Sequence, residues 1–379
     1  MTATPTDPSL AERLLDRTLD LVSIASPSRE EADVLAAIGA AVPPGFTVAD
    51  DADADDADAA LLLLPERPRD GTPLVVLAGH ADTVPRGGAP APARDGDAVV
   101  GRGAADMKGG LAVMLELVDD LARGAVRSPD LDVAVAVVGR EELPFEESAL
   151  RPLLERREAL RHAALAIVLE PTGNALEVGC LGNLNVRVTV RGTAAHSARP
   201  WLGDNAIHRA IEALGSIADL PVRDVDVGGH VFKEVVSVTT IEGGTALNVV
   251  PDLVTAHVNF RYAPSHTPAE AEARLRELLG HHTLELEVLG NAPPAPPATS
   301  NPLVARLRDA GDLEVRPKQA WTPVAEFAMH GVDAVNLGPG DPRYAHVDGE
   351  RVDAASLVRT YDVLRAFLEA RAAAEEPSA

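Results

Sequence analysis

An apolar run that ends at a histidine constrains the fold of this chain more than any other stretch. Residues 74–79 (LVVLAG) form a continuous apolar segment, which predicts a short buried strand. The strand delivers His80 and Asp82 to its C-terminal end, where open α/β sheets place their sites. Side chains two positions apart on a strand point the same way, so Asp82 can hold the imidazole of His80. A metal ligand supported by a carboxylate has this arrangement.

A glycine-rich loop follows and brings in another carboxylate. Residues 101–110 (GRGAADMKGG) carry Asp106 into the start of a predicted helix. The spacing leads us to expect that His80 and Asp106 begin a two-metal hydrolytic site, which later parts of the chain complete.

Strands and helices alternate in the first half of the chain. The predicted strands are 61–64, 74–80, 131–138 and 163–169, and the predicted helices are 9–22, 108–121 and a helix that ends at Ala41. Ser28 and Glu31 resemble a capping box that opens this last helix. Three of the apolar strands end at a potential ligand. The alternation predicts an α/β fold with a mixed, mostly parallel sheet flanked by helices.

The pattern changes after Cys180 and predicts an inserted α+β domain. Strands at 185–190, 234–241, 253–262 and 283–289 and helices at 205–217 and 268–279 give a β-α-β-β-α-β order. Asp204 is the expected N-cap of the first of these helices. A proline-rich linker begins at residue 291. We therefore expect a catalytic domain made of residues 1–181 and 291–379, with an inserted domain at 182–290.

Charge and composition exclude some classes of protein. The formal net charge is −24, and both nucleic acids and anionic membranes require basic patches, so we expect neither as a partner. The single cysteine allows no intrachain disulfide. Residues 1–10 are polar and contain proline, without the apolar core of a signal peptide, and a cytoplasmic location is the simplest expectation.

Five side chains could hold a pair of zinc ions. Zinc takes nitrogen and oxygen ligands, and a dinuclear site adds one bridging carboxylate. The candidates each follow an apolar strand or lie in a Gly/Pro-rich loop: His80, Asp106, Glu142, Glu170 and His346. Any one of them alone is more simply explained as an ordinary polar residue. Their joint occurrence is what predicts the site.

Motifs along essentially the whole chain resemble one family of enzymes. They are HADTVP at 80–85, GRGAADMKG at 101–109, REE at 140–142, LEPT at 169–172, GTAAHS at 192–197 and the segment 336–346. With these motifs the chain resembles the metal-dependent aminoacylase/carboxypeptidase family, which includes desuccinylases, deacetylases and carboxypeptidases. The resemblance implies a zinc-peptidase-like catalytic domain with an inserted ferredoxin-like dimerisation domain, and hydrolysis of the amide of a small N-acyl amino acid. N-succinyl-L,L-diaminopimelate is the substrate it implies first.

The resemblance also implies roles for individual residues. Asp106 would bridge two Zn²⁺ ions per subunit, with His80 and Glu170 on one ion and Glu142 and His346 on the other. Cobalt is a possible substitute for zinc. Asp82 would support His80, and Glu141 would be the general base.

Further roles would fall to residues of the inserted domain and the last loop. His196 would stabilise the oxyanion of a partner subunit's site, which implies a homodimer with shared sites. The implied substrate contacts are Arg199, Asn248, Arg261, Gly338 and Gly340. From the residues alone, His196 could equally be a structural histidine in a turn, and Arg261 an ordinary strand arginine.

One segment departs from the family pattern. Desuccinylases usually have Asp and Arg where this chain has Pro323 and Glu326. A carboxylate near the acyl pocket would disfavour a dianionic succinyl group unless a cation compensates. Other N-acyl amino acid deacylases, carboxypeptidases or dipeptidases of the same family therefore remain open. A non-catalytic relative is the alternative of a different class, and the joint presence of the six metal and base residues argues against it.

Overall fold

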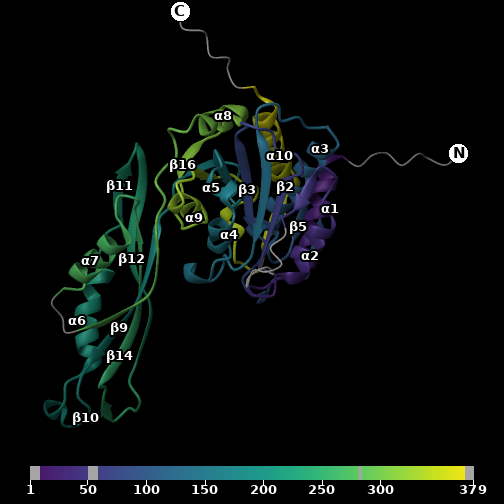
Figure 1. Ribbon diagram of the computed structural model, residues 1–379. Coiled ribbons are helices and arrows are strands. Elements are labelled where there is room, and N and C mark those ends of the chain that lie inside the picture. Colours follow the sequence, from purple (N-terminus) through teal and green to yellow (C-terminus); the bar gives the residue numbers. More distant parts are fainter. Residues whose placement is uncertain (1–8, 50–58, 281–283, 372–379) are drawn as a thin grey trace, which may run out of the picture. The chain divides into compact units, whose positions relative to one another are not determined.

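The computed structural model describes residues 9–49, 59–280 and 284–371 of the chain (Figure 1). Most of the N-terminal segment used above to predict a location, residues 1–8, lies outside these ranges. The chain divides into a larger unit (Met1–Val178, Ala298–Arg316 and Glu326–Ala379) and a smaller unit (Gly179–Pro297 and Pro317–Ala325). The functional domains 1–181, 182–290 and 291–379 stay a prediction. None of the helices in the described ranges has the length and apolarity needed to cross a bilayer.

A mostly parallel sheet forms the centre of the larger unit. β3 pairs in parallel with β6 and β7, and β17 pairs in parallel with β7, whereas β1, β2 and β8 run antiparallel to their neighbours. Within the described residues its spatial order is β1 (Phe46–Val48), β2 (Ala60–Pro65), β6 (Asp132–Val138), β3 (Leu74–His80), β7 (Leu165–Val168), β17 (Ala334–Asn336), β8 (Leu176–Val178) and β16 (Val315–Pro317).

The central strands are almost entirely apolar between their ends because helices cover both faces of the sheet (Figure 1). Every residue of β6 and of β7 is buried. The helices of this unit are α1 (Leu10–Ser23), α2 (Ala32–Ala40), α3 (Gly109–Ala122), α4 (Leu150–Arg156), α5 (Glu158–Arg161), α8 (Pro302–Gly311), α10 (Ala354–Glu369) and α9 (Val324–Met329), which the boundary between the units divides. α1, α3 and α10 pack against one another in the main core. The predicted α/β fold with a mostly parallel sheet is confirmed.

A small antiparallel sheet supports the glycine-rich loop. Its three strands in the described chain are β4 (Ala93–Asp95), β5 (Ala98–Val100) and β18 (Arg351–Asp353). After β5 the chain passes through Gly101 and Gly103, whose φ angles of 141° and 87° are open to glycine, and enters the single turn η2 (Ala104–Lys108). The Asp106–Met107 peptide bond is cis. Asp106 lies in this turn, directly before α3.

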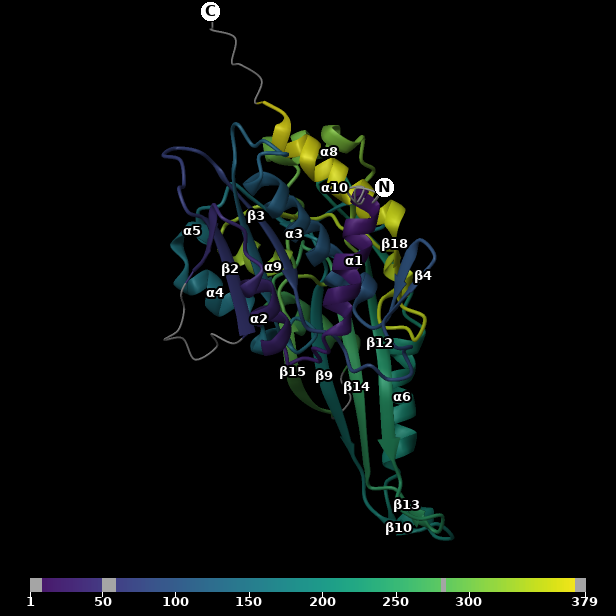
Figure 2. The ribbon, with the colours of Figure 1, turned by 90° about the vertical axis from the view of Figure 1, so that its right-hand side faces the viewer.

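The smaller unit is an antiparallel sheet with helices packed on it (Figure 1). Buried and less buried residues alternate along its central strands, which gives the sheet one apolar face. That face packs against the two helices in a second core. In the described residues the strand order is β11 (Arg223–Val227), β12 (His230–Gly243), β14 (Leu253–Tyr262), β9 (Gly182–Arg191) and β15 (Glu285–Ala292), part of which Figure 2 shows, and the helices are α6 (Ala206–Ala218) and α7 (Pro268–Leu278).

Two predicted helix caps are wrong. Ser28 does not cap α2, because the helix begins at Ala32 and its N-cap position is Glu31, which makes no side-chain cap hydrogen bond. The Ser28 hydroxyl donates to Asp82. Asp204 does not cap α6, because the side chain of Asn205 accepts from the backbone N–H of Ile207 and His208. β11 was also absent from the predicted order, since its sequence RDVDV carries three charges and no continuous apolar run.

Candidate metal centre

The carboxyl ends of parallel strands bring the predicted ligands to one edge of the sheet. His80 ends β3 and lies in register with Val138, the last residue of β6. Ala78 of β3 is in register with Val168, the last residue of β7. The segments that carry Glu141, Glu142 and Glu170 begin directly after these strands. Parallel pairing therefore gathers their side chains at the same edge as His80.

The two ring nitrogens of His80 face different partners. The side chain is 1% exposed, and Nδ1 lies 2.9 Å from the backbone oxygen of Asp82. Nε2 lies 3.1 Å from Oδ1 of Asp106 and 3.7 Å from Oε1 of Glu170. Donation from Nδ1–H to the carbonyl fixes the tautomer and leaves Nε2 for a metal. The Asp82 carboxylate is farther from Nδ1, at 3.5 Å, so the backbone oxygen makes the shorter contact.

The Asp106 carboxylate lies between two imidazoles. Oδ1 faces His80, and Oδ2 lies 3.3 Å from Nε2 of His346. The same nitrogen of His346 is 2.9 Å from Oε1 of Glu142. His346 lies in the loop after the short turn η5 (Pro342–Tyr344), with a φ of 63°. One carboxylate that presents its two oxygens to two histidines has the geometry of a bridging ligand.

Three groups of side chains in the described ranges could each hold a metal ion. Within each group the ligand atoms lie within 4.8 Å of one another. The groups are His80–Asp106–Glu170, His80–Glu141–Glu142 and Asp106–Glu142–His346. The first and third share Asp106 and have the composition of the two predicted ligand sets. The nitrogen and oxygen donors are of the kind that zinc accepts, so the residues present fit a pair of such ions.

Burial and mutual repulsion shape the charges of the cluster. Burial and the nearby Glu170 carboxylate raise the pKa of Glu141 well above its usual range. Burial lowers the pKa of His80, but hydrogen bonds to Asp106 and Asp82 outweigh it and hold that pKa well above the usual value. Hydrogen bonds to Asp106 and Glu142 raise the pKa of His346 to about 10. The cluster therefore carries an excess of negative charge that attracts protons, and metal ions would take their place.

The Asp82 carboxylate fixes the backbone of Glu141 and Glu142. It is fully buried, and its oxygens accept hydrogen bonds from the backbone N–H of Glu141 at 3.1 Å and of Glu142 at 3.2 Å. The hydroxyl of Ser28 donates to it at 2.7 Å. Although burial raises the pKa of Asp82, hydrogen bonds from His80 and Ser28 outweigh it and lower the value. Asp82 thus positions both sides of the cluster, a wider role than the support of His80 alone.

Glu350 was missed by the sequence reasoning. Its carboxylate accepts hydrogen bonds from the backbone N–H of Ala105 and of Asp106, both at 3.1 Å, and from Nη1 of Arg102 at 2.8 Å. Glu350 is fully buried and fixes the backbone that carries the bridging Asp106. The available signal was its position four residues after His346, in the same loop. The role of Ser28 was missed as well, and its sequence pattern matched a helix cap.

His196, Arg199 and Asn248 gather at one end of the smaller unit. β10 (Ala195–His196) pairs with β13 (Val249–Val250) there (Figure 2). The backbone N–H of Arg199 donates to the His196 oxygen at 2.7 Å, and that of Ser197 donates to the Asn248 oxygen at 2.9 Å. All three predicted side chains are exposed. The same tip exposes Trp201, Leu202 and Leu247, at 75%, 65% and 105%.

Arg261 lies elsewhere on the smaller unit. β14 starts at Leu253, which pairs with Arg191, and Arg261 lies eight residues further along the strand, opposite Asn183. At about 3.3 Å per residue this is roughly 26 Å from the β10 end. Its Nε donates to Oδ1 of Asn259 at 3.1 Å. Within one smaller unit, therefore, the structure does not bring Arg261 together with His196.

Gly338 and Gly340 follow β17 in the larger unit. A Cβ on Gly338 would lie 2.2 Å from the backbone oxygen of Leu169, so the backbones approach too closely for any other residue. Gly340 has a φ of 83° and packs against Ala105. These glycines bring the last loop against the backbone of Leu169 and Glu170 and against Ala105, the residue before Asp106.

Glu326, the residue that departs from the family pattern, is buried. It is 1% exposed, and burial raises its pKa to about 7, although Ser148 and Arg151 partly offset this effect. Ser148 follows Glu142 by six residues, so Glu326 packs on the segment that leaves the metal cluster. The negative charge that Glu326 brings in place of an arginine is therefore only partial near neutral pH, because a carboxyl with this pKa is partly protonated there.

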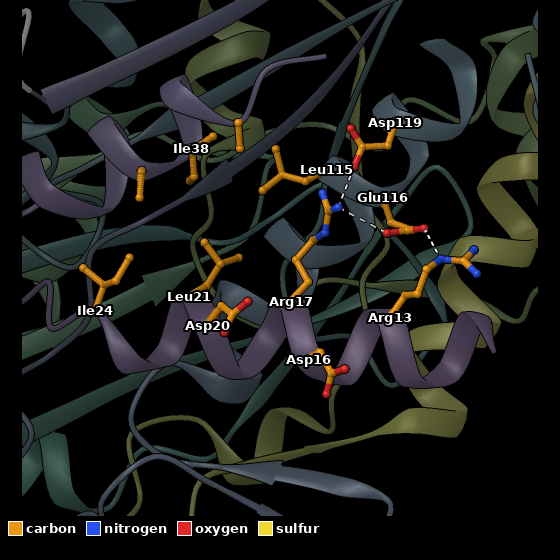
Figure 3. A pocket seen from close by; sticks show the side chains of 12 residues that line it. Arg13, Asp16, Arg17, Asp20, Leu21, Ile24, Ile38, Leu115, Glu116 and Asp119 are labelled. Atoms are coloured by element: carbon orange, nitrogen blue, oxygen red, sulfur yellow. Dashed lines mark hydrogen bonds and ion pairs between the residues drawn. The ribbon is translucent and has the colours of Figure 1, made fainter. Parts of the chain in front are cut away.

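A separate cavity of about 510 Å³ lies between α1, α2 and α3 (Figure 3). Both arginines on its wall are paired with carboxylates: Arg13 with Glu116 at 2.7 Å, and Arg17 with Glu116 at 3.4 Å and Asp119 at 2.5 Å. None of the potential metal groups in the described part of the chain includes these residues. The ion pairs on its wall connect α1 to α3, and the cavity is not part of the metal centre.

Comparisons with known proteins agree with this architecture. Residues 178–287 match the peptidase dimerisation domain, and residues 63–165 match peptidase family M28. The succinyl-diaminopimelate desuccinylase of Corynebacterium glutamicum is 36% identical over 299 residues, which are 78% of this chain and 80% of that protein. The enzyme of that name from Rhodospirillum centenum is 31% identical, with 81% and 84% covered.

Solved structures share the fold at lower identity. The aminopeptidase PepT of Bacillus cereus is 23% identical with a TM-score of 0.76, over 95% of this chain and 98% of that one. An M20 family metallo-carboxypeptidase of Sulfolobus solfataricus is 17% identical with a TM-score of 0.77, over 94% and 98%. From the sequence relatives and the matched domains, this chain belongs to the succinyl-diaminopimelate desuccinylase family of M20 metallopeptidases and is a metal-dependent hydrolase.

Proposed function

We propose that the chain is a di-zinc amidohydrolase that cleaves N-succinyl-L,L-diaminopimelate to succinate and L,L-diaminopimelate, in the synthesis of lysine and peptidoglycan precursors. The observation that supports it most is the Asp106 carboxylate, which presents one oxygen to His80 and the other to His346. The substrate follows from the names of the relatives. A cytoplasmic location stays a prediction.

The chain's side chains divide into two ligand sets around Asp106. His80 and Glu170 would hold one zinc ion, and Glu142 and His346 the other. Cobalt, with the same nitrogen and oxygen ligands, is a suitable substitute. When bound, the ions lower the pKa of a water molecule and polarise the scissile carbonyl.

Glu141 is the proposed general base. Its carboxylate is partly buried beside the cluster, with Oε2 3.9 Å from Nε2 of His80. Burial and the neighbouring Glu170 carboxylate raise its pKa, which increases its affinity for the proton that it would take. Glu141 would take the proton of the attacking water and pass it to the leaving nitrogen. Asp82 would keep it in place through the backbone hydrogen bond to Glu141.

A homodimer would supply the remaining groups. The match of residues 178–287 to a dimerisation domain supports this assembly, and the apolar side chains exposed beside His196 suit a contact with a partner. His196 of a partner subunit would donate a hydrogen bond to the oxyanion. Asn248 and Arg199 lie at the same tip, and Arg261 has the planar fork that suits a substrate carboxylate.

A second candidate substrate class rests on Glu326. A buried carboxyl with a pKa of about 7 stands where desuccinylases usually have arginine. An uncharged acyl group, or a dipeptide, avoids the repulsion that a succinyl carboxylate would meet. Other N-acyl amino acid deacylases and dipeptidases are therefore the alternative.

The experiment is a substrate panel with the zinc-loaded protein. We expect about two zinc ions per chain by elemental analysis and succinate release from N-succinyl-L,L-diaminopimelate. Glu141→Gln should retain both ions and lose about 10²–10⁴-fold in kcat. Turnover of acetylated amino acids or dipeptides without turnover of the succinyl substrate would replace the first candidate by the second. A folded protein that binds no metal would contradict both and support a non-catalytic relative.

A further inference from the structure

A second cavity beside the catalytic loop has an unusual wall. Its volume is about 220 Å³, and it lies where the end of α1 meets the loop after Asp82 and the glycine-rich loop. Three of its lining side chains, Arg86, Arg102 and Lys108, are cationic, and none is a carboxylate; the others include Ser23, Ser26 and Thr83. This is notable in a chain of net charge −24. We propose that the cavity is a binding site for a small tetrahedral oxyanion, of the sulfate or phosphate type.

Arg102 supplies a donor that has no partner. Its side chain is 9% exposed, and Nη1 donates to Glu350 at 2.8 Å, which compensates its charge on one side. Nε is buried and has no hydrogen-bond partner among the described residues. A buried N–H without a partner costs about 1–3 kcal/mol. An anion in the cavity that Arg102 lines would satisfy it.

Lys108 supplies a second donor. Its side chain is 1% exposed, and Nζ donates to the backbone oxygens of Leu21 at 3.0 Å and Ile24 at 2.7 Å. An ammonium group has three N–H donors, so one is left. No ion pair in the described ranges uses Lys108, so its charge is not cancelled by a direct carboxylate contact.

The size and the mouth of the cavity set the class of ligand. Pockets for drug-sized molecules hold about 300–1,000 Å³, so a cavity of this volume suits a small ion with a few waters. Arg86 is exposed on the loop after Asp82, and it also makes no ion pair among the described residues. Ser23, the last residue of α1, is exposed and lines the cavity as well. An incoming anion would therefore meet a cation and a hydroxyl first, and then the buried donors.

The test compares two substitutions at Ser23 in the zinc-loaded protein. Sodium sulfate is titrated calorimetrically at constant ionic strength. Ser23→Glu places a negative charge in the cavity, whereas Ser23→Gln is its neutral match. We expect Ser23→Gln to bind sulfate within about threefold of the wild type and Ser23→Glu to bind at least about tenfold more weakly, since like charges in contact repel strongly. Arg86→Gln should weaken binding, and Arg94→Gln, outside the cavity, should not.

The same titrations can overturn the proposal. If sulfate bound only at the metal ions, the wild type and the Ser23 and Arg86 variants would all have the same affinity, which would contradict the proposal. An absence of saturable binding to the wild-type protein would also contradict the site. Because Ser23 and Arg86 are exposed, circular dichroism of the variants should match the wild type, and a loss of binding then reports on the cavity.

Discussion

Replacing Asp82 by asparagine tests how the metal centre is assembled. The two oxygens of Asp82 accept from the N–H groups of Glu141 and Glu142 and from the hydroxyl of Ser28. Asparagine has the same shape, but one of its two terminal groups is a donor. One backbone N–H would then face an NH₂ group without an acceptor. Asp82 is fully buried, so water cannot replace the lost partner.

The expected effects follow from these contacts. Losing one hydrogen bond to a charged acceptor removes about 1.5–3 kcal/mol, and we expect the unfolding free energy of Asp82→Asn to fall by about 2–4 kcal/mol. Removing a group that orients metal ligands costs about 10–100-fold in metal affinity. Urea denaturation of the metal-free protein measures the first effect, and competition with a fluorescent zinc chelator measures the second.

Ser28→Ala is the matched control for Asp82→Asn. It removes one hydroxyl donor and leaves both backbone hydrogen bonds to the carboxylate in place. We expect a loss of about 1 kcal/mol in stability and zinc affinity within about threefold of the wild type. Wild-type zinc affinity in Asp82→Asn would refute the reasoning, since Glu141 and Glu142 would then be positioned without this carboxylate.

Three further predictions concern buried positions. In the folded state Glu326 keeps its proton up to a pKa of about 7, above its unfolded value, so stability is present at low pH and is lost as pH rises from about 4.5 through about 7. Urea titration gives the unfolding free energy of Glu326→Gln minus that of the wild type, and this difference should rise by about 1–3 kcal/mol from pH 5 to pH 8. The same difference at both pH values would contradict the buried acid. Gly338→Ala should lose about 1–3 kcal/mol because its Cβ meets the Leu169 oxygen, while Gly215→Ala, in α6 with open space around it, should gain about 0.5–1 kcal/mol. Glu350→Gln should lower zinc affinity about tenfold by loosening the Asp106 backbone, and full retention of zinc would argue that the loop holds itself.

Much of the site could be predicted because most of its side chains lie directly after apolar strands. The apolar runs that became β3, β6 and β7 are recognisable without a structure, and the ligand-bearing segments begin where these runs end. Parallel pairing then brings their side chains to one edge of the sheet. The proximity of His346 to Asp106 required the family resemblance, since a loop with a positive φ carries no periodic signal.

The missed residues share a physical cause. Ser28 and Glu350 act on backbone and carboxylate groups that lie far away in the sequence, and local patterns do not report such partners. Ser28 even matched a local motif, the capping box, but α2 begins only at Ala32, and the Ser28 hydroxyl donates to the distant Asp82 carboxylate. The charged strand β11 was missed because its two apolar side chains, Val225 and Val227, form no continuous run, although they pack on a small cluster while the strand pairs with β12.

The packing of α1 against α10 has a consequence for biosynthesis. These are the first and last helices of the described chain, and both line the main core. α10 begins at residue 354 and leaves the ribosome after every other helix and strand of the described chain, so α1 and the sheet keep apolar surface uncovered until then. The core of the larger unit should thus be completed only once α10 has emerged, and nascent chains stalled before residue 354 should depend on chaperones to stay in solution.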